Sequence, residues 1–129
     1  MQPELSEQER AALRDFANVD WRSVLSAKDF YDTAALLECV DLVISVDTAV
    51  AHLAGAMGKP VFLLNRYDNC WRWLHSRNDT PWYPSMTIFR QTRPGDWATV
   101  MHRVASSLAS LPVFRGGQPA APGALATAA

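Results

Sequence analysis

Three short apolar runs stand out along the chain, at residues 42–46, 60–64 and 86–90. The first two are almost continuous in valine, isoleucine, leucine and phenylalanine, without the strict alternation of a half-exposed strand. Such runs are typical of strands that are buried on both faces of a parallel sheet. The pattern therefore predicts three short strands, with Pro60 at the first position of the second, where a proline is tolerated.

Apolar residues recur at helical spacing between these runs, and capping residues mark where helices begin. Ser6 and Glu9 form a capping-box pattern, and Asp29 and Asp96 are suited to cap the helices that follow them. Gly58 can end a helix in the left-handed conformation. The predicted helices cover residues 7–16, 30–39, 48–57 and 97–108.

The order of these elements predicts an α/β fold. The strand at 42–46, the helix at 48–57 and the strand at 60–64 form one crossover unit, which we expect to be right-handed. Three short parallel strands flanked by helices make half of a doubly wound, Rossmann-like architecture. A full nucleotide-binding sheet normally has more strands, so the others could lie upstream of Met1, and the chain would then be a fragment.

The domain prediction follows from composition along the chain. We expect one Rossmann-like domain at residues 1–112. Residues 113–129 are rich in alanine, glycine and proline and have few large side chains, so we expect a disordered tail.

Composition and charge exclude several classes of protein. Hydrophobic residues make up 49% of the chain and charged residues 19%, with a net charge of -1, which does not favour a nucleic-acid binder. No apolar run approaches the roughly 20 residues of a membrane span, and the N-terminus has no apolar signal region. Cys39 and Cys70 stand far apart and indicate reduced thiols in the cytoplasm.

The candidate chemistry lies where the first strand meets the helix at 48–57. Ligands of open α/β sheets bind beyond the carboxyl ends of the strands, and here that end is followed by Asp47, Thr48 and Ala49. The helix start offers free backbone N–H groups and a positive dipole end to an anion. Ala49 is small enough for a diphosphate to approach, and Thr48 shares a helix face with His52.

Each of these residues also has a purely structural interpretation. Asp47 can be an N-cap for the N–H of Val50, and Thr48 can be only a first-turn residue. His52, among apolar neighbours, can be a hydrogen-bonded core histidine. Gly55 more simply permits close helix packing.

The long segment at 65–85 carries the other candidates. Arg66 and Asp68 directly follow the second strand and could contact a ligand. The aromatic residues of the segment, with arginines among them, can stack on a base or sugar or flank a cleft, or they can close one end of the core. They are Trp71, Trp73, Trp82 and Tyr83, with Arg72 and Arg77. Cys70 and His75 do not make a zinc set.

Residues 41–62 resemble the C-terminal domain of heptosyltransferase-like enzymes, glycosyltransferase family 9. The motif elements are Asp47-Thr48-Ala49, then His52, the small-residue run Ala54-Gly55-Ala56, and Gly58-Lys59-Pro60 before a strand. The resemblance extends over residues 29–108. The later aromatic motifs look like the variants found at the C-terminus of bacterial tetratricopeptide-repeat proteins.

The resemblance implies a GT-B fold, in which two Rossmann-like domains face a cleft and the C-terminal domain binds the nucleotide-sugar donor. It assigns donor binding to Asp47, Thr48, Ala49, Val50 and His52. Possible further ligand contacts are Arg66, Asp68 and Trp71. Ala49 departs from the commoner glycine after Asp-Thr, which narrows the space near the phosphates.

The resemblance also implies an inverting, metal-independent transferase without a cofactor, and no Asp-x-Asp metal motif occurs in the chain. The family's catalytic base lies in the N-terminal domain, and nothing here matches it, so we expect the isolated chain to be inactive. Expected partners are the missing N-terminal Rossmann-like domain, possible upstream helical repeats, and a second copy of the chain in a homodimer. The alternative is a non-catalytic protein-interaction or nucleotide-sensing module.

Overall fold

The computed structural model describes residues 6–16, 18 and 29–112. The chain divides into two units, Met1–Cys39 and Val40–Ala129, and each is described by itself. The tail expected at residues 113–129 lies outside the described residues. Its disorder and the domain bounds at 1–112 therefore stay predictions.

In the described part of the first unit lie two helices whose predicted caps are confirmed. In front of α1 (Glu7–Arg14), Ser6 and Glu9 form both bonds of a capping box. The Glu9 N–H donates to Ser6 Oγ at 3.3 Å, and the Ser6 N–H donates to Glu9 Oε2 at 2.8 Å. In front of α2 (Phe30–Glu38), the Asp29 carboxylate accepts from two backbone N–H groups, both at 2.9 Å. Each cap satisfies helix donors that would otherwise lack partners.

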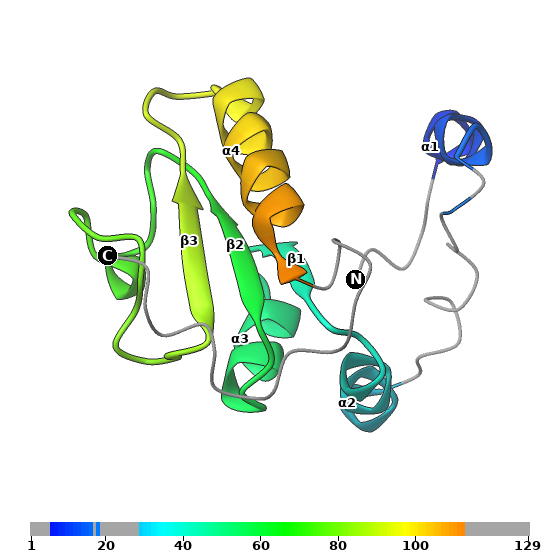
Figure 1. Ribbon diagram of the computed structural model, residues 1–129, viewed down its shortest axis with the longest axis horizontal. Helices are drawn as coiled ribbons and strands as arrows, with labels where there is room; N and C mark the ends of the chain where they lie inside the picture. The colour runs from blue at the N-terminus through cyan, green and yellow to red at the C-terminus, as the bar shows by residue number, and fades with distance from the viewer. Residues whose placement is uncertain (1–5, 17, 19–28, 113–129) are drawn as a thin grey trace. The chain divides into compact units, whose positions relative to one another are not determined.

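The second unit is built on the predicted parallel sheet. Its strands are β1 (Val43–Val46), β2 (Val61–Asn65) and β3 (Met86–Arg90), in the spatial order β1-β2-β3 (Figure 1). Val43 pairs with Val61, and Val61 in turn pairs with Met86, so the three strands begin side by side. The α/β fold and the short parallel sheet expected from the apolar runs are confirmed.

Two helices cover opposite faces of this sheet (Figure 1). Helix α3 (Ala49–Ala56) connects β1 to β2, and helix α4 (Trp97–Ser110) follows β3. Ala51 and Ala54 are completely buried in α3, because their small side chains let the helix lie close to its neighbours. Gly58 follows α3 with a φ of 73°, the left-handed conformation expected of it.

The core under α4 follows from the alternation of side chains along the strands. Phe62 of β2 and Phe89 of β3 pack their rings 4.8 Å apart. Val100 and Val104 of α4 complete this cluster, and both are at most 2% exposed. The residues that follow β2 and β3 lie beside the start of α4, since Arg66, Gln91 and Trp97 line one depression.

Strand β1 is an edge of the sheet, and its outer positions are only partly covered. Ile44 and Val46 are 43% and 46% exposed, whereas Leu63 and Ile88 in the other two strands are completely buried. An edge strand also leaves one row of backbone N–H and C=O groups without a partner strand in the described sheet. The strand that leads into the candidate site is therefore the least enclosed of the three.

Asp96 caps the start of α4, as the sequence predicts. The Asp96 carboxylate accepts from the Thr99 N–H at 3.2 Å, and it lies 3.3 Å from the Thr92 hydroxyl, which donates to it. The hydrogen bonds from Thr99 are the main cause that holds the pKa of Asp96 below its ordinary value. A carboxylate at a helix start is also favoured by the helix dipole.

This cap makes stability depend on pH. Because the folded-state pKa of Asp96 is lowered, its contribution is present above the unfolded-state pKa of about 4 and is lost as the pH falls through the folded-state value. We expect the melting temperature of Asp96→Asn to be lower than that of the wild type near pH 7, with a difference that shrinks as the pH falls below about 4. Calorimetric melting across this pH range measures the difference in melting temperature. Asp41→Asn changes an exposed carboxylate that caps no described helix and is the control. A difference that is constant with pH would contradict the prediction.

Candidate functional site

The β1–α3 junction brings a carboxylate, a hydroxyl and a helix start together. Thr48 is the N-cap residue of α3, with extended backbone angles and no side-chain bond to the helix. Its hydroxyl lies 3.1 Å from Ser45 Oγ instead. The alternative interpretation of Asp47 as the N-cap is therefore wrong: the cap position is one residue later. The first N–H groups of α3 are left without a side-chain acceptor, which suits an anion.

Asp47 faces His52 across the first turn of α3. Asp47 Oδ1 lies 3.4 Å from His52 Nε2, an ion-pair distance if the imidazole is protonated. The two side chains are 31% and 30% exposed, so both are half-buried and still reachable from solvent. The Asp47 carboxylate therefore lies beside the His52 imidazole at the start of α3.

His52 is itself enclosed by two aromatic residues from the segment at 65–85. The Trp73 ring stacks on the imidazole with centroids 5.2 Å apart and an interplanar angle of 23°. The Tyr83 hydroxyl lies 3.0 Å from His52 Nδ1. Both ring nitrogens of His52 thus have protein partners, as the interpretation of a hydrogen-bonded histidine expects, although the side chain is not fully buried.

The tryptophans of the segment at 65–85 divide between core and surface. Trp73, in the short 3-10 helix η2 (Trp71–Trp73), is completely buried, so the interpretation of closing the core is right for it. Trp71 and Trp82 are 70% and 56% exposed, and for them that interpretation is wrong. Trp82 Nε1 donates to the Arg72 carbonyl at 3.0 Å, so the exposed Trp82 indole is bonded to the backbone of the residue that follows Trp71.

Arg90 at the end of β3 anchors this segment. Its Nη2 donates to the Trp73 carbonyl at 3.0 Å and to the Arg77 carbonyl at 3.4 Å. Burial lowers the pKa of the Arg90 guanidinium below its ordinary value. A partly buried arginine that donates to two carbonyls fixes the loop that carries Trp73, and so fixes the surroundings of His52.

Arg66 and Asp68 lie at a second position on the same edge of the sheet. They face each other at 3.4 Å and are strongly exposed. With Gln91 and the start of α4 they line a shallow depression of about 330 Å³. Gln91 is buried, and its Oε1 accepts from the Tyr67 N–H at 3.2 Å.

Sequence reasoning missed two buried polar residues at this edge, Asn65 and Gln91. Asn65 ends β2 and is 2% exposed, with a side-chain Nδ2 that has no hydrogen-bond partner. Its carbonyl accepts from the Gln91 N–H at 3.0 Å. A polar residue directly after a buried apolar run is the signal that could have identified both positions.

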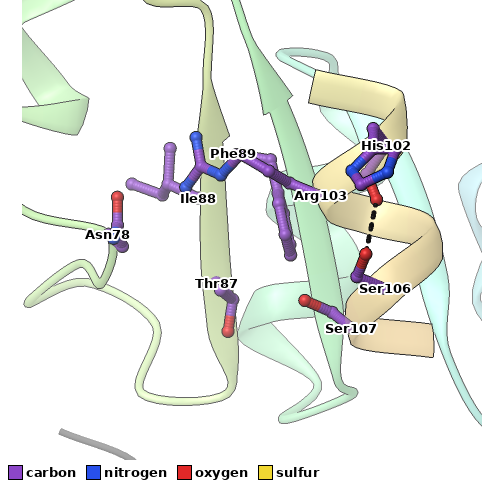
Figure 2. Close-up of a pocket in the computed structure, with 8 residues that line it drawn as sticks. All are labelled: Asn78, Thr87, Ile88, Phe89, His102, Arg103, Ser106 and Ser107. Carbon is purple, nitrogen blue, oxygen red and sulfur yellow. Dashed lines mark hydrogen bonds between the residues drawn. The ribbon is translucent and has the colours of Figure 1, made fainter. Parts of the chain in front are cut away.

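A depression of about 360 Å³ lies elsewhere, between β3 and α4 (Figure 2). Arg103 reaches from α4 across Phe89, with its guanidinium 5.7 Å from the ring centroid, and Nη1 donates to the Arg90 carbonyl at 3.3 Å. Ser106 Oγ donates to the His102 carbonyl at 3.0 Å. Its polar groups are thus partly used within the protein, and none of the predicted donor-site residues lines it. The β1–α3 junction is the stronger candidate.

The sequence profile of glycosyltransferase family 9 (heptosyltransferase) matches residues 3–94, well over half of the chain. The chain belongs to glycosyltransferase family 9. The matched region contains β1, α3, β2 and β3, and with them the whole β1–α3 junction.

One curated protein is similar to part of the chain. Protein FlbA of Caulobacter vibrioides is 42% identical over 80 residues, which cover 62% of this chain. The chain spans about 13% of the length of that relative. No solved structure shows a significant similarity to the chain.

The family assignment leaves some expectations as predictions. The second GT-B domain, the association with tetratricopeptide repeats and the cytoplasmic location stay predictions.

Both cysteines, Cys39 and Cys70, carry free thiols. Among the residues that the structure describes, no three His, Cys, Asp or Glu side chains gather to hold a metal ion, and no helix is long and apolar enough to cross a membrane.

Proposed function

We propose that this chain is the donor-binding part of a glycosyltransferase and that the β1–α3 junction binds the diphosphate and sugar of a nucleotide-sugar donor. The observation that carries the proposal is the start of α3, which lies at the carboxyl end of β1 and has no side-chain cap. Uncapped N–H groups and the positive end of the helix dipole attract a diphosphate. The membership of glycosyltransferase family 9 supplies the class of ligand.

Each residue of the junction has a role in this proposal. The backbone N–H groups of Ala49 and Val50 donate to phosphate oxygens, and the small Ala49 side chain leaves room for them. The Thr48 hydroxyl turns away from Ser45 Oγ to donate to the same diphosphate. The Asp47 carboxylate would repel a phosphate, so it accepts from a sugar hydroxyl. His52 lies 3.4 Å from the Asp47 carboxylate and orients it.

The proposed reaction is inversion at the anomeric carbon without a metal. A base outside this chain takes the proton of the acceptor hydroxyl, whose oxygen forms a bond to the anomeric carbon as the bond to the diphosphate breaks. The leaving diphosphate carries the negative charge that the N–H groups of α3 stabilise. Further contacts for the donor in this proposal are Arg66, Asp68 and Trp71. Because the base lies outside this chain in the proposed reaction, the 129-residue chain alone transfers no sugar.

Calorimetry on the intact protein with a panel of nucleotide sugars tests this proposal. We expect Thr48→Val to weaken donor binding by roughly 10- to 150-fold, since a hydrogen bond to a charged group contributes about 1.5–3 kcal/mol. The control is Thr87→Val, which makes the same change at an exposed position of β3. Absence of binding to any nucleotide sugar, or an unchanged Kd for Thr48→Val, would count against the donor site.

The same measurement addresses the alternative of a non-catalytic interaction module. The exposed indoles of Trp71 and Trp82 favour that alternative, because large exposed aromatic side chains often mark contact surfaces. A protein-interaction module would bind no nucleotide sugar. In calorimetry, its variants at the β1–α3 junction would then give the same result as the wild type.

A further inference from the structure

Tyr83 comes from a part of the chain that is distant in sequence from the β1–α3 junction. Its hydroxyl lies 3.0 Å from His52 Nδ1, although the two residues are 31 positions apart. On the opposite side of the imidazole, Nε2 lies 3.4 Å from Asp47 Oδ1. The histidine therefore bridges a phenol and a carboxylate, in the order Tyr83, His52, Asp47.

The chemistry of the two outer groups decides where the imidazole carries its hydrogen. An ionised carboxylate only accepts hydrogen bonds, so the nitrogen that faces Asp47 is best satisfied as Nε2–H. In a neutral imidazole, Nδ1 is then an acceptor, and Tyr83 has the hydroxyl hydrogen to donate to it. The partner of one ring nitrogen in this way sets the role of the other.

Tyr83 is held in place by packing as well as by this hydrogen bond. A side-chain Cβ added at Gly55 would lie 2.6 Å from Tyr83 Cγ, so the tyrosine ring rests directly against the backbone of α3. The ring meets His52 edge-on, with centroids 5.7 Å apart and an angle of 66°. Trp73 stacks on the same imidazole. The imidazole is thus restrained by a ring on each of two sides.

We infer that Tyr83 is a positioning residue of the donor site, which donates to Nδ1 and so stabilises the Nε2–H tautomer that faces the Asp47 carboxylate. With Oδ1 turned toward His52, Oδ2 is the oxygen that accepts from a sugar hydroxyl of the donor. The part of this inference that concerns the donor rests on the proposed function. The order of contacts from Tyr83 through His52 to Asp47 does not.

The tautomer is measured by NMR of the ring nitrogens in protein labelled at its three histidines, at about pH 8, where histidines are ordinarily neutral. His52→Gln assigns the signals. We expect His52 to be almost entirely the Nε2–H tautomer in the wild type and the minor tautomer to rise several-fold in Tyr83→Phe. Tyr31→Phe removes the hydroxyl of a residue that is 88% exposed and is the matched control. A wild-type Nδ1–H tautomer, or no change in Tyr83→Phe, overturns the inference.

Donor calorimetry on the intact protein completes the test. We expect Tyr83→Phe to weaken binding of the nucleotide sugar by roughly 3- to 10-fold, the effect of one lost hydrogen bond, and Tyr31→Phe to leave it unchanged. If the wild type binds donor and Tyr83→Phe binds it equally well, the positioning role is wrong while the proposed function stands. If the wild type binds no donor, the positioning role falls with the proposed function, and the NMR result still decides which nitrogen of His52 carries the hydrogen.

Discussion

Trp73→Ala is expected to lower the free energy of unfolding by about 3–5 kcal/mol, the range for removing a large aromatic side chain from a core. The side chain is completely buried and stacks on His52 with centroids 5.2 Å apart. Its removal leaves a cavity between the segment at 65–85 and α3, and it releases one side of the His52 imidazole. Urea unfolding followed by circular dichroism measures the change.

The loop offers its own control for this prediction. Trp71 lies two positions away, in the same 3-10 helix, and is 70% exposed. Trp71→Ala therefore removes the same atoms from the surface, where substitutions usually change stability by less than about 0.5 kcal/mol. Similar losses for the two variants would show that the loop does not pack as described.

Gly55→Ala is expected to destabilise the protein by about 1–3 kcal/mol, the usual cost of an overpacked site. Helix propensity alone predicts the opposite sign, because alanine is better than glycine in a helix by roughly 1 kcal/mol. The added Cβ would lie 2.6 Å from Tyr83 Cγ and 2.9 Å from Cδ1. These atoms are at the base of a packed ring and cannot move aside as the end of a flexible chain would. Thermal melting gives the sign.

A double variant tests whether contact with Tyr83 causes the loss of stability in Gly55→Ala. Tyr83→Ala makes room for the new methyl group, so Gly55→Ala should cost much less in that background than in the wild type. The difference is the coupling energy between the two residues, which for packed neighbours is about 0.5–3 kcal/mol. Additive effects of the two substitutions would mean that Gly55→Ala acts elsewhere.

Local patterns in the sequence determined most of the fold of the described residues. Unbroken apolar runs indicate buried parallel strands because both faces of such strands need cover, and β1 and β2 lie where those runs are. The caps at Ser6, Asp29 and Asp96 involve a side chain and backbone groups two to three positions away, so short motifs suffice to predict them. The Asp47 to His52 segment, which carries the family resemblance, is local in the same sense.

Only the tertiary structure decided how the residues of the candidate site are used. Trp71, Trp73 and Trp82 are the same residue type in one loop, yet only Trp73 of the three is buried. Its burial depends on how the segment at 65–85 packs against α3, where Trp73 stacks on His52. The same return brings Tyr83 to His52 and makes Gly55 necessary. Contacts of this kind depend on packing between segments that are far apart in the chain, for which a single sequence has no periodic signal. The sequence by itself therefore determined the junction and its family, and the packing of a distant loop decided which groups surround it.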